Sequence, residues 1–365
     1  MKHLHNIVTV FDIQDTVTEI KPLGDGLIND TYIVRTAGDT PHYVLQRINH
    51  AIFTDVDGLQ ANIDAVTGHI RRKLQQAGAT DIDRRVLRFI PAKATGKTYH
   101  LDPDGNYWRV SQFIPGSHTL SAVTPETAYI TGVAFGNFQS MLTDIDRQLG
   151  ESIPRFHDME FRLHQLREAV ASDPVGRCNE VAAELAEIDR RAADMCAAEQ
   201  LHRDGLLPKR ICHCDTKVNN MLFDDHDQVL CVIDLDTVMP SYIFSDYGDF
   251  LRTAANTGAE DDPDLSRVSF DMDIFRAFTR GYLESTRQFL LPVEIEHLPY
   301  AAALFPYMQA VRFLADYING DTYYKTAYPE HNLVRTRAQL QLLYSIETHY
   351  PEMRAFIAAL HTARQ

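Results

Sequence analysis

HCDTKVNNMLFD, residues 213–224, is followed by the apolar run VLCVI at 229–233 and then by Asp234. A histidine stands two residues before Asp215, and an asparagine, Asn220, stands five residues after it. The apolar run has the length and the β-branched content of a strand, and it delivers a second carboxylate at its end. The stretch therefore predicts a β-hairpin that carries two carboxylates and one amide on its loops.

This spacing supplies the groups that phosphoryl transfer from ATP requires. Asp215 is the candidate base that orients a hydroxyl, and Asn220 and Asp234 are the candidates for holding Mg²⁺ between the phosphates. Lys217 can meet the negative charge of the phosphate in transfer. The alternative is a hairpin whose polar loop contains a histidine and an aspartate without a catalytic role.

Composition limits the class of protein and its partners. A chain of 365 residues with 45% hydrophobic and 23% charged residues is ordinary for a soluble globular protein. Its net charge of -15 argues against nucleic acid and anionic membrane surfaces as partners. An anionic nucleotide would therefore need a metal and locally basic groups. No apolar run reaches the length of about 18 residues that a membrane span needs, and the MKHLH start does not resemble a signal peptide.

The cysteines favour a reducing compartment. There are five, and none forms a C-x-x-C motif. The tripeptide at 212–214, Cys-His-Cys, has no second pair with the spacing of a zinc site. Reduced thiols in a cytoplasm are the simpler interpretation, so we expect a cytoplasmic protein.

The first third of the chain has the pattern of an antiparallel sheet. Strands are expected at 17–21, 31–34, 42–46 and 108–114, and a helix is expected at 54–77, where apolar residues recur at three- and four-residue spacing. Beyond residue 115 the pattern is mainly helical, with helices expected at 124–145, 157–172, 178–200, 271–288, 295–319 and 331–363.

These patterns predict an α+β protein of two lobes. Residues 1–115 would form a nucleotide-binding lobe with an antiparallel sheet. Residues 116–365 would form a helical lobe that holds the catalytic loop and the site of the second substrate. A cleft between two such lobes suits a nucleotide and a small molecule.

Two segments of the first lobe are candidates for nucleotide binding. Gly24, Asp25 and Gly26 join two expected strands, so they favour a flap whose backbone N–H groups approach phosphates; an ordinary glycine turn is the alternative. Gln112 and Ile114 precede a Pro-Gly pair and fit a hinge whose backbone would bind the adenine edge; a strand that ends at a proline is the alternative.

The third strand has glutamine where a kinase usually has lysine. Gln46 takes that position, and Arg47 should point to the opposite face of the strand. An amide can bind a phosphate but brings no charge, so Lys217 and Mg²⁺ would carry more of the neutralisation. A degenerate kinase that only binds nucleotide is the rival interpretation, although the candidate catalytic residues are intact.

The chain resembles the aminoglycoside phosphotransferase-like kinases, a branch of the protein-kinase-like fold, and within it the N-acetylhexosamine 1-kinase subfamily over nearly its full length. The segments that carry the resemblance are GDGLINDTYIV (24–34), YVLQRIN (43–49), HCDTKVNNMLFD (213–224), VIDLDTVMP (232–240), SDYGDFLRTAANT (245–257) and VRFLADYINGDTYY…YPEHNLVRTR (311–337). The last segment discriminates most, and Gln46 fits this subfamily.

The resemblance implies transfer of the γ-phosphate of ATP to the C1 hydroxyl of N-acetylglucosamine or N-acetylgalactosamine. It assigns the base to Asp215 and the sugar contacts to Arg312 and Tyr323. Read alone, Arg312 would pair with Asp316 one turn away, and Tyr323 would serve packing. Asp236, two residues after the second carboxylate, would support the metal site or reach the sugar.

Two rival functions remain open from the sequence. A kinase for another small alcohol, such as homoserine, choline or an aminoglycoside, would share the phosphate machinery without needing residues 311–337. A non-catalytic module would bind ATP without turning it over. Three further residues have structural interpretations: Asp246 and Asp249 would brace the catalytic loop from a helix behind it, and His213 would anchor that loop.

Overall fold

The computed structural model describes residues 2–24, 28–38 and 41–362, which divide into two compact units. The sheet unit comprises Met1–Leu120, Asp144–Pro154 and Asn220–Met239. The helical unit comprises Ser121–Thr143, Arg155–Asn219 and Pro240–Gln365. The hairpin that carries the second carboxylate thus belongs to the sheet unit. The boundary expected between residues 115 and 116 stays a prediction about functional lobes.

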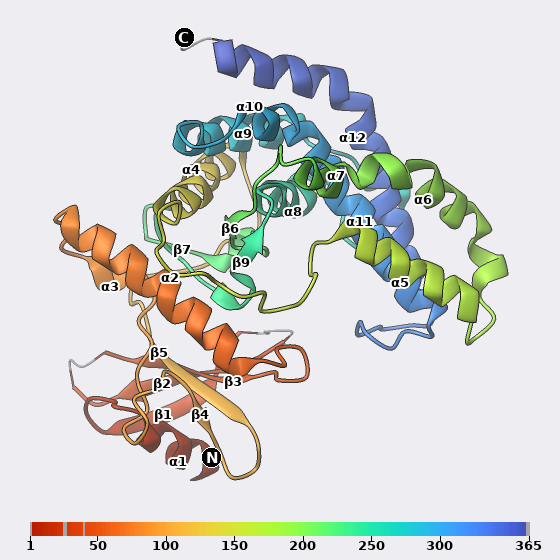
Figure 1. Cartoon of the computed structure of the whole chain (residues 1–365). Helices are drawn as coiled ribbons and strands as arrows, with labels where there is room; N and C mark the ends of the chain where they lie inside the picture. Colours follow the sequence, from red (N-terminus) through yellow and green to blue (C-terminus); the bar gives the residue numbers. More distant parts are fainter. Residues whose placement is uncertain (1, 25–27, 39–40, 363–365) are drawn as a thin grey trace. The chain divides into compact units, whose positions relative to one another are not determined.

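The sheet unit is built on a five-stranded antiparallel sheet with strand order β1-β2-β3-β5-β4 (Figure 1). Its strands are β1 (Val17–Pro22), β2 (Asp30–Thr36), β3 (Tyr43–Ile48), β4 (His100–Leu101) and β5 (Tyr107–Gln112). The four strands expected from the sequence are all present, within a few residues of the expected bounds. In the central pair, Gln46 of β3 lies directly opposite Arg109 of β5.

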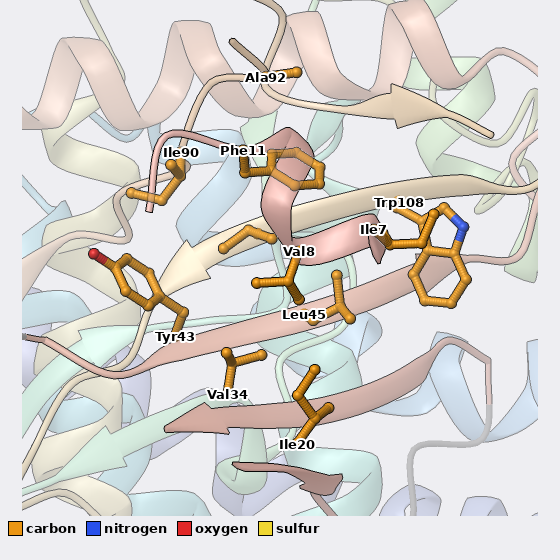
Figure 2. Packing of buried hydrophobic residues seen from close by; sticks show 11 residues of the cluster. Ile7, Val8, Phe11, Ile20, Val34, Tyr43, Leu45, Ile90, Ala92 and Trp108 are labelled. Carbon is orange, nitrogen blue, oxygen red and sulfur yellow. The ribbon is translucent and has the colours of Figure 1, made fainter. Parts of the chain in front are cut away.

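One face of this sheet is closed by α1 (Lys2–Val10), a helix that the sequence interpretation missed. Phe11, just after the helix, and Val8 pack with Leu45 and Trp108 in a buried cluster (Figure 2). Because side chains alternate along a strand, the neighbours of these residues, including Gln46, point to the opposite face. The sheet therefore has an apolar face under α1 and a polar face for the site.

The helix α2 (Val56–Gln76) begins where the sequence predicts it. The side chain of Asp55 accepts from the Gly58 N–H at 2.9 Å, which caps the first turn. Buried Asn62 donates to the carbonyl oxygens of Gly150 (2.8 Å) and Val238 (3.2 Å). Through this amide, α2 is tied to the segment that follows the second carboxylate. The short α3 (Ile82–Arg85) and the hairpin β7 (Met221–Phe223) and β8 (Val229–Val232) complete the sheet unit.

The helical unit contains the remaining helices and the short strands β6 (Arg210–Cys212) and β9 (Met239–Ser241). The helices are α4 (Pro125–Met141), α5 (Met159–Ser172), α6 (Ala182–Met195), α7 (Ala197–Arg203), α8 (Phe244–Ala254), α9 (Met272–Thr286), α10 (Pro292–Glu296), α11 (Leu298–Ile318) and α12 (His331–Thr362). The sequence predicts one continuous helix at 178–200 and another at 295–319. This prediction of continuity was wrong, because the first range is interrupted at Cys196 and the second at His297.

Together these elements confirm the predicted α+β fold, with an antiparallel sheet in the N-terminal part and mainly helices in the C-terminal part. None of the helices in the described ranges is both long and apolar enough to cross a lipid bilayer.

Close packing of α4 against α9 depends on glycine. A Cβ atom at Gly281 of α9 would overlap the carbonyl oxygen of Tyr129 in α4, and one at Gly132 of α4 would overlap the carbonyl oxygen of Phe278 in α9. Backbone atoms cannot swing aside as flexible side chains do, so each contact requires the absence of a side chain.

We therefore expect Gly281→Ala to lower the free energy of unfolding by about 1–3 kcal/mol through overpacking, measured by urea denaturation. Gly68→Ala in α2 is the matched control: its nearest neighbour to a new Cβ is the Arg72 guanidinium at 3.7 Å. That change should stabilise the protein by up to about 1 kcal/mol through helix propensity. Equal effects of the two substitutions would contradict the glycine-dependent packing.

Candidate active site

The loop after β6 is held by a buried carboxylate. Asp246 of α8 is 1% exposed, and its two oxygens accept from the backbone N–H groups of His213 (3.0 Å) and Cys214 (2.8 Å). Gln139 donates to the same carboxylate at 2.7 Å. Cys214 itself has a left-handed backbone, with φ of 63°. Burial raises the pKa of Asp246, and these N–H donors offset part of that increase.

The histidine of the motif serves the same loop. His213 is fully buried, with its ring edge-on to Phe135 and Phe138 at centroid distances of 5.7 and 5.9 Å. The Asp215 backbone N–H lies 3.3 Å from its Nδ1, which assigns Nδ1 as the acceptor. The predicted anchoring role of His213 is therefore confirmed.

A second carboxylate, one turn later in α8, holds the same loop. Asp249 accepts from the Thr216 N–H at 3.1 Å and pairs with buried Arg252 at 3.0 Å. Arg252 also pairs with Glu260 at 2.6 Å. Asp246 and Asp249 thus hold successive residues of the loop, as the sequence predicts.

Asp215 and Lys217 lie together at the end of this braced loop. The Lys217 ammonium is 2.9 Å from a carboxylate oxygen of Asp215. Burial lowers the pKa of Lys217, but the carboxylates of Asp215 and Asp249 outweigh that effect and raise it above its ordinary value. The lysine is therefore a permanent cation beside the candidate base at neutral pH.

The other two candidate ligands lie close together in the sheet unit. The Ile233 N–H donates to the carbonyl oxygen of Asn220 at 2.9 Å, which extends the β7–β8 ladder. Asp234 follows directly, with a left-handed backbone at φ 57°. A non-glycine residue in this conformation is uncommon and is found more often at functional sites. Carboxylate and amide oxygens are the donors that Mg²⁺ prefers, so these residues fit the expected metal.

The polar face of the sheet carries a buried network that includes Asp236. Arg109, 2% exposed, donates from Nη1 and Nη2 to the two carboxylate oxygens of Asp236 and from Nε to Gln46 at 2.9 Å. Asn29 donates to Asp236 at 2.7 Å and accepts from the Asn49 N–H at 2.9 Å. Asp236 is therefore engaged by the sheet, and its expected role toward metal or sugar stays a prediction.

The remaining candidates for nucleotide binding lie at the two ends of the sheet. Gly24 has φ of 69°, the left-handed region that favours glycine, whereas Asp25 and Gly26 lie outside the described residues. The Gln112 N–H donates to Arg88 at 2.8 Å, and the carbonyl of buried Ile114 accepts from the Ser117 hydroxyl at 2.7 Å. The flap and the hinge stay predictions.

Arg312 and Tyr323 line one pocket of about 220 Å³ in the helical unit. Arg162, Gln165, Asn319 and Tyr324 also line it. Arg312 donates to Gln309 at 2.7 Å rather than to Asp316, and Tyr323 is 61% exposed, so the two structural alternatives weighed from the sequence do not describe these side chains.

Asp316 instead shapes the pocket wall. Its buried carboxylate accepts from the backbone N–H groups of Thr322 (2.9 Å), Tyr323 (2.8 Å) and Tyr324 (3.0 Å). Asn332 donates to the same carboxylate at 2.9 Å. One charged group therefore sets the path of the loop that presents both tyrosines.

The pocket is electropositive. Burial and then the neighbouring charge of Arg312 lower the pKa of Arg162 to about 10, so the Arg162 guanidinium is still charged at neutral pH. Burial, followed by Arg312, Arg162 and Arg252, lowers the pKa of His157 well below its ordinary value, so this ring is neutral. In the described part of the chain, neither Arg162 nor Arg312 forms an ion pair with a carboxylate; both donate to carbonyl or amide oxygens.

Comparison with known proteins identifies the family. Residues 19–283 match the model of the phosphotransferase enzyme family, APH. The chain belongs to this family. That match covers the braced loop, the hairpin and the sheet, but it ends before Arg312 and Tyr323.

Solved structures show the same fold for this phosphotransferase. A microcompartment-associated aminopropanol kinase is 16% identical with a TM-score of 0.57, covering 97% of this chain and 98% of that one. A spectinomycin phosphotransferase, solved with ADP and spectinomycin, is 14% identical with a TM-score of 0.56, covering 96% and 98%. A choline/ethanolamine kinase family protein from Mesorhizobium loti is 17% identical with a TM-score of 0.53, covering 99% of both chains.

Several residues of the phosphotransferase site were not found from the sequence. Arg109 and Arg162 looked like ordinary charged residues, because their partners Asp236 and Arg312 are more than 100 residues away along the chain. Arg252 had a local signal, since it lies three residues after Asp249 on one helix face.

A titratable group supports the helix that carries Arg162. Glu199 is buried and accepts from the Met159 N–H, at the start of α5, at 2.7 Å. Burial is the main cause that raises the pKa of Glu199 to about 7, from an ordinary value of 4.5. The folded state therefore binds this proton more tightly than the unfolded state does, so the contribution of Glu199 to stability falls as pH rises from 4.5 to 7.

We expect the phosphotransferase to lose more stability than its Glu199→Gln variant when the pH is raised from 5 to 8, by up to about 3 kcal/mol. Glutamine keeps an acceptor for the Met159 N–H without the charge. Urea denaturation of both proteins at the two pH values measures the difference. Parallel pH dependence of the two proteins would contradict the assignment of this proton to Glu199.

Proposed function

We propose that the chain is an ATP- and Mg²⁺-dependent kinase that phosphorylates N-acetylhexosamines, N-acetylglucosamine or N-acetylgalactosamine, at the C1 hydroxyl. Membership of the phosphotransferase family supports the transfer chemistry. The observation that carries the choice of acceptor is the charge of the pocket at Arg162 and Arg312, which has two guanidinium groups and a volume of about 220 Å³.

The charge of this pocket disfavours cationic acceptors. Choline, ethanolamine, aminopropanol and aminoglycosides carry ammonium groups, which the two guanidinium groups of this pocket would repel. The carboxylate that lines the pocket, Asp316, is buried and already accepts from three backbone N–H groups and from Asn332. Like charges placed together cost binding energy and act against the wrong ligand. A neutral acetylated sugar offers hydroxyl and carbonyl oxygens as acceptors, which suit guanidinium and amide donors such as those of Arg312, Gln165 and Asn319.

The size of the pocket acts in the same direction. Pockets for drug-sized ligands range over about 300–1,000 Å³. At about 220 Å³ the cavity is smaller, which suits one sugar ring better than the several rings of an aminoglycoside. Tyr323 and Tyr324, presented by the loop that Asp316 holds, add hydroxyl groups at its wall.

In the proposed mechanism, Asp215 orients the C1 hydroxyl and accepts its proton as the phosphate is transferred. Lys217, 2.9 Å from Asp215, would stabilise negative charge that develops on the phosphoryl group. Asn220 and Asp234 would hold Mg²⁺, which supplies neutralisation of the phosphate oxygens when bound. The polar face of the sheet, with Gln46, and the segment at Gly24 would bind the nucleotide.

The test is release of ADP from ATP and Mg²⁺ with a panel of acceptors: N-acetylglucosamine, N-acetylgalactosamine, glucose, galactose, homoserine, choline and kanamycin. We expect turnover with the acetylated sugars and an acid-labile anomeric phosphate as product. Turnover only with choline or kanamycin would overturn the sugar assignment and retain the kinase. ATP binding without turnover of any acceptor would favour a non-catalytic nucleotide-binding module.

Replacement of the proposed base should abolish turnover while the fold is retained. We expect Asp215→Asn to lower kcat by about a thousand-fold or more, because general base catalysis and the charge beside the acceptor are both lost. Asp225→Asn, an exposed aspartate in the turn of the hairpin, is the matched control and should leave kcat unchanged. Near-normal turnover of the Asp215 variant would disprove this role.

Loss of one guanidinium should weaken binding of the sugar in particular. A hydrogen bond from a charged donor contributes about 1.5–3 kcal/mol, so we expect Arg312→Gln to raise the KM for the acetylated sugar by about ten-fold or more. The KM for ATP should stay within about two-fold, as for the exposed control Arg354→Gln. An unchanged KM for the sugar would show that this pocket does not bind the acceptor.

A further inference from the structure

We propose that Arg109 is a positioning residue for the metal site. Through its pair with Asp236, it holds the segment 234–237, and with it the candidate Mg²⁺ ligand Asp234, on the polar face of the sheet. In a kinase, a lysine on β3 ordinarily forms a structural ion pair beside the phosphates, and here the pair of Arg109 and Asp236 would have that structural role. This inference rests on the proposed function only in assuming that Asp234 binds a metal.

The geometry of the pair is that of a fixed clamp. Arg109 and Asp236 have side chains that are each 3% exposed, and the guanidinium binds both carboxylate oxygens. Bidentate pairing fixes the orientation of both planar groups, which a lysine cannot do. Asn29, the residue just before β2, donates to the same carboxylate, so Asp236 is bound both by β5 and by the chain at the start of β2.

The segment that is clamped has a backbone that needs support. Asp234 adopts the left-handed region, and its side chain makes no capping bond to the turn at Leu235–Thr237 that follows. Such conformations persist where surrounding contacts determine them. The contacts on the C-terminal side of Asp234 include the pair at Asp236, the bond from Asn29 to the same carboxylate, and the bond from Asn62 of α2 to the carbonyl of Val238.

The same pair gives a physical reason for glutamine at position 46. Gln46 lies directly opposite Arg109, and its oxygen accepts the Nε–H of the guanidinium at 2.9 Å. Its amide nitrogen donates to Thr31 at 3.3 Å. A lysine at this position would place a second buried cation beside Arg109, which like-charge repulsion disfavours. The cation of this site therefore lies on β5, as Arg109, instead of on β3, and the side-chain oxygen of Gln46 orients it.

The network also argues against Asp236 as a direct metal ligand. Both of its oxygens already accept hydrogen bonds from buried donors, at Arg109 and Asn29. A move toward a metal would leave the Arg109 guanidinium buried without its partner, which is costly. Asp234, by contrast, is exposed.

The test measures binding of ADP with and without Mg²⁺ by calorimetry, for the full chain and for the variants Arg109→Met, Asp236→Asn and the double variant. The quantity of interest is the Mg²⁺ gain, the ratio of the Kd in EDTA to the Kd in Mg²⁺. We expect Arg109→Met to leave the Kd in EDTA within about three-fold and to reduce the Mg²⁺ gain at least about ten-fold, the cost of about 1.4 kcal/mol.

The double variant separates positioning from stability. Neutral replacement of both partners of a buried ion pair is often tolerated, so its melting temperature should recover toward that of the parent. Its Mg²⁺ gain should stay low, because no bidentate clamp is restored.

If Arg109→Met does not fold, Arg109→Lys takes its place, since it keeps the charge and loses the bidentate geometry. Arg47→Met, which removes the exposed pair between Arg47 of β3 and Asp30 of β2, is the matched control.

A full Mg²⁺ gain in Arg109→Met or Arg109→Lys would overturn the proposal. So would a gain that is lost in Asp236→Asn and retained in the Arg109 variant, because that result would make Asp236 a direct ligand. A parent protein that shows the gain but turns over none of the acetylated sugars would refute the proposed function and leave this inference standing. Absence of the gain in the parent would overturn the inference.

Discussion

The catalytic loop depends on the carboxylate of Asp246, buried in the helical unit. Two consecutive backbone N–H groups, from His213 and Cys214, donate to it, and Cys214 takes a left-handed conformation there. A buried charge is tolerated only where donors surround it, so the carboxylate and the loop determine each other. Asp249 and Arg252 continue the arrangement one turn along α8. The position of Asp215 follows from this packing and not from the preference of a loop.

Buried charged side chains elsewhere have a comparable role, since each holds backbone at a candidate site. Asp316 holds three successive N–H groups beside the pocket, and Arg109 with Asp236 holds the segment after Asp234. Proteins in which apolar residues replace both members of a buried ion pair often fold as well as the parent protein. The pattern therefore indicates that these charges are retained for precise placement of functional groups more than for stability.

Much of this was predictable from the sequence, because the signals were local. Alternation and turn residues placed the strands, and apolar periodicity placed α2 and α12. Asp246 and Asp249 were predicted from the helix start around Gly248, although they lie more than 30 residues along the chain from the loop that they hold. α1 was missed because its single apolar stripe over nine residues is weak evidence alone. Arg109 and Arg162 were missed because their partners are distant in sequence, and only the fold brings such residues together.

The way the loop after α11 is anchored has a consequence for substitutions at residues 322–324. Asp316 binds main-chain N–H groups, which every residue except proline offers. The side chains at 322–324 are therefore not needed to keep the loop in place, and they can change without loss of its path. If the pocket binds the acceptor as proposed, acceptor preference can evolve by substitution at these positions while the backbone of the loop stays in place.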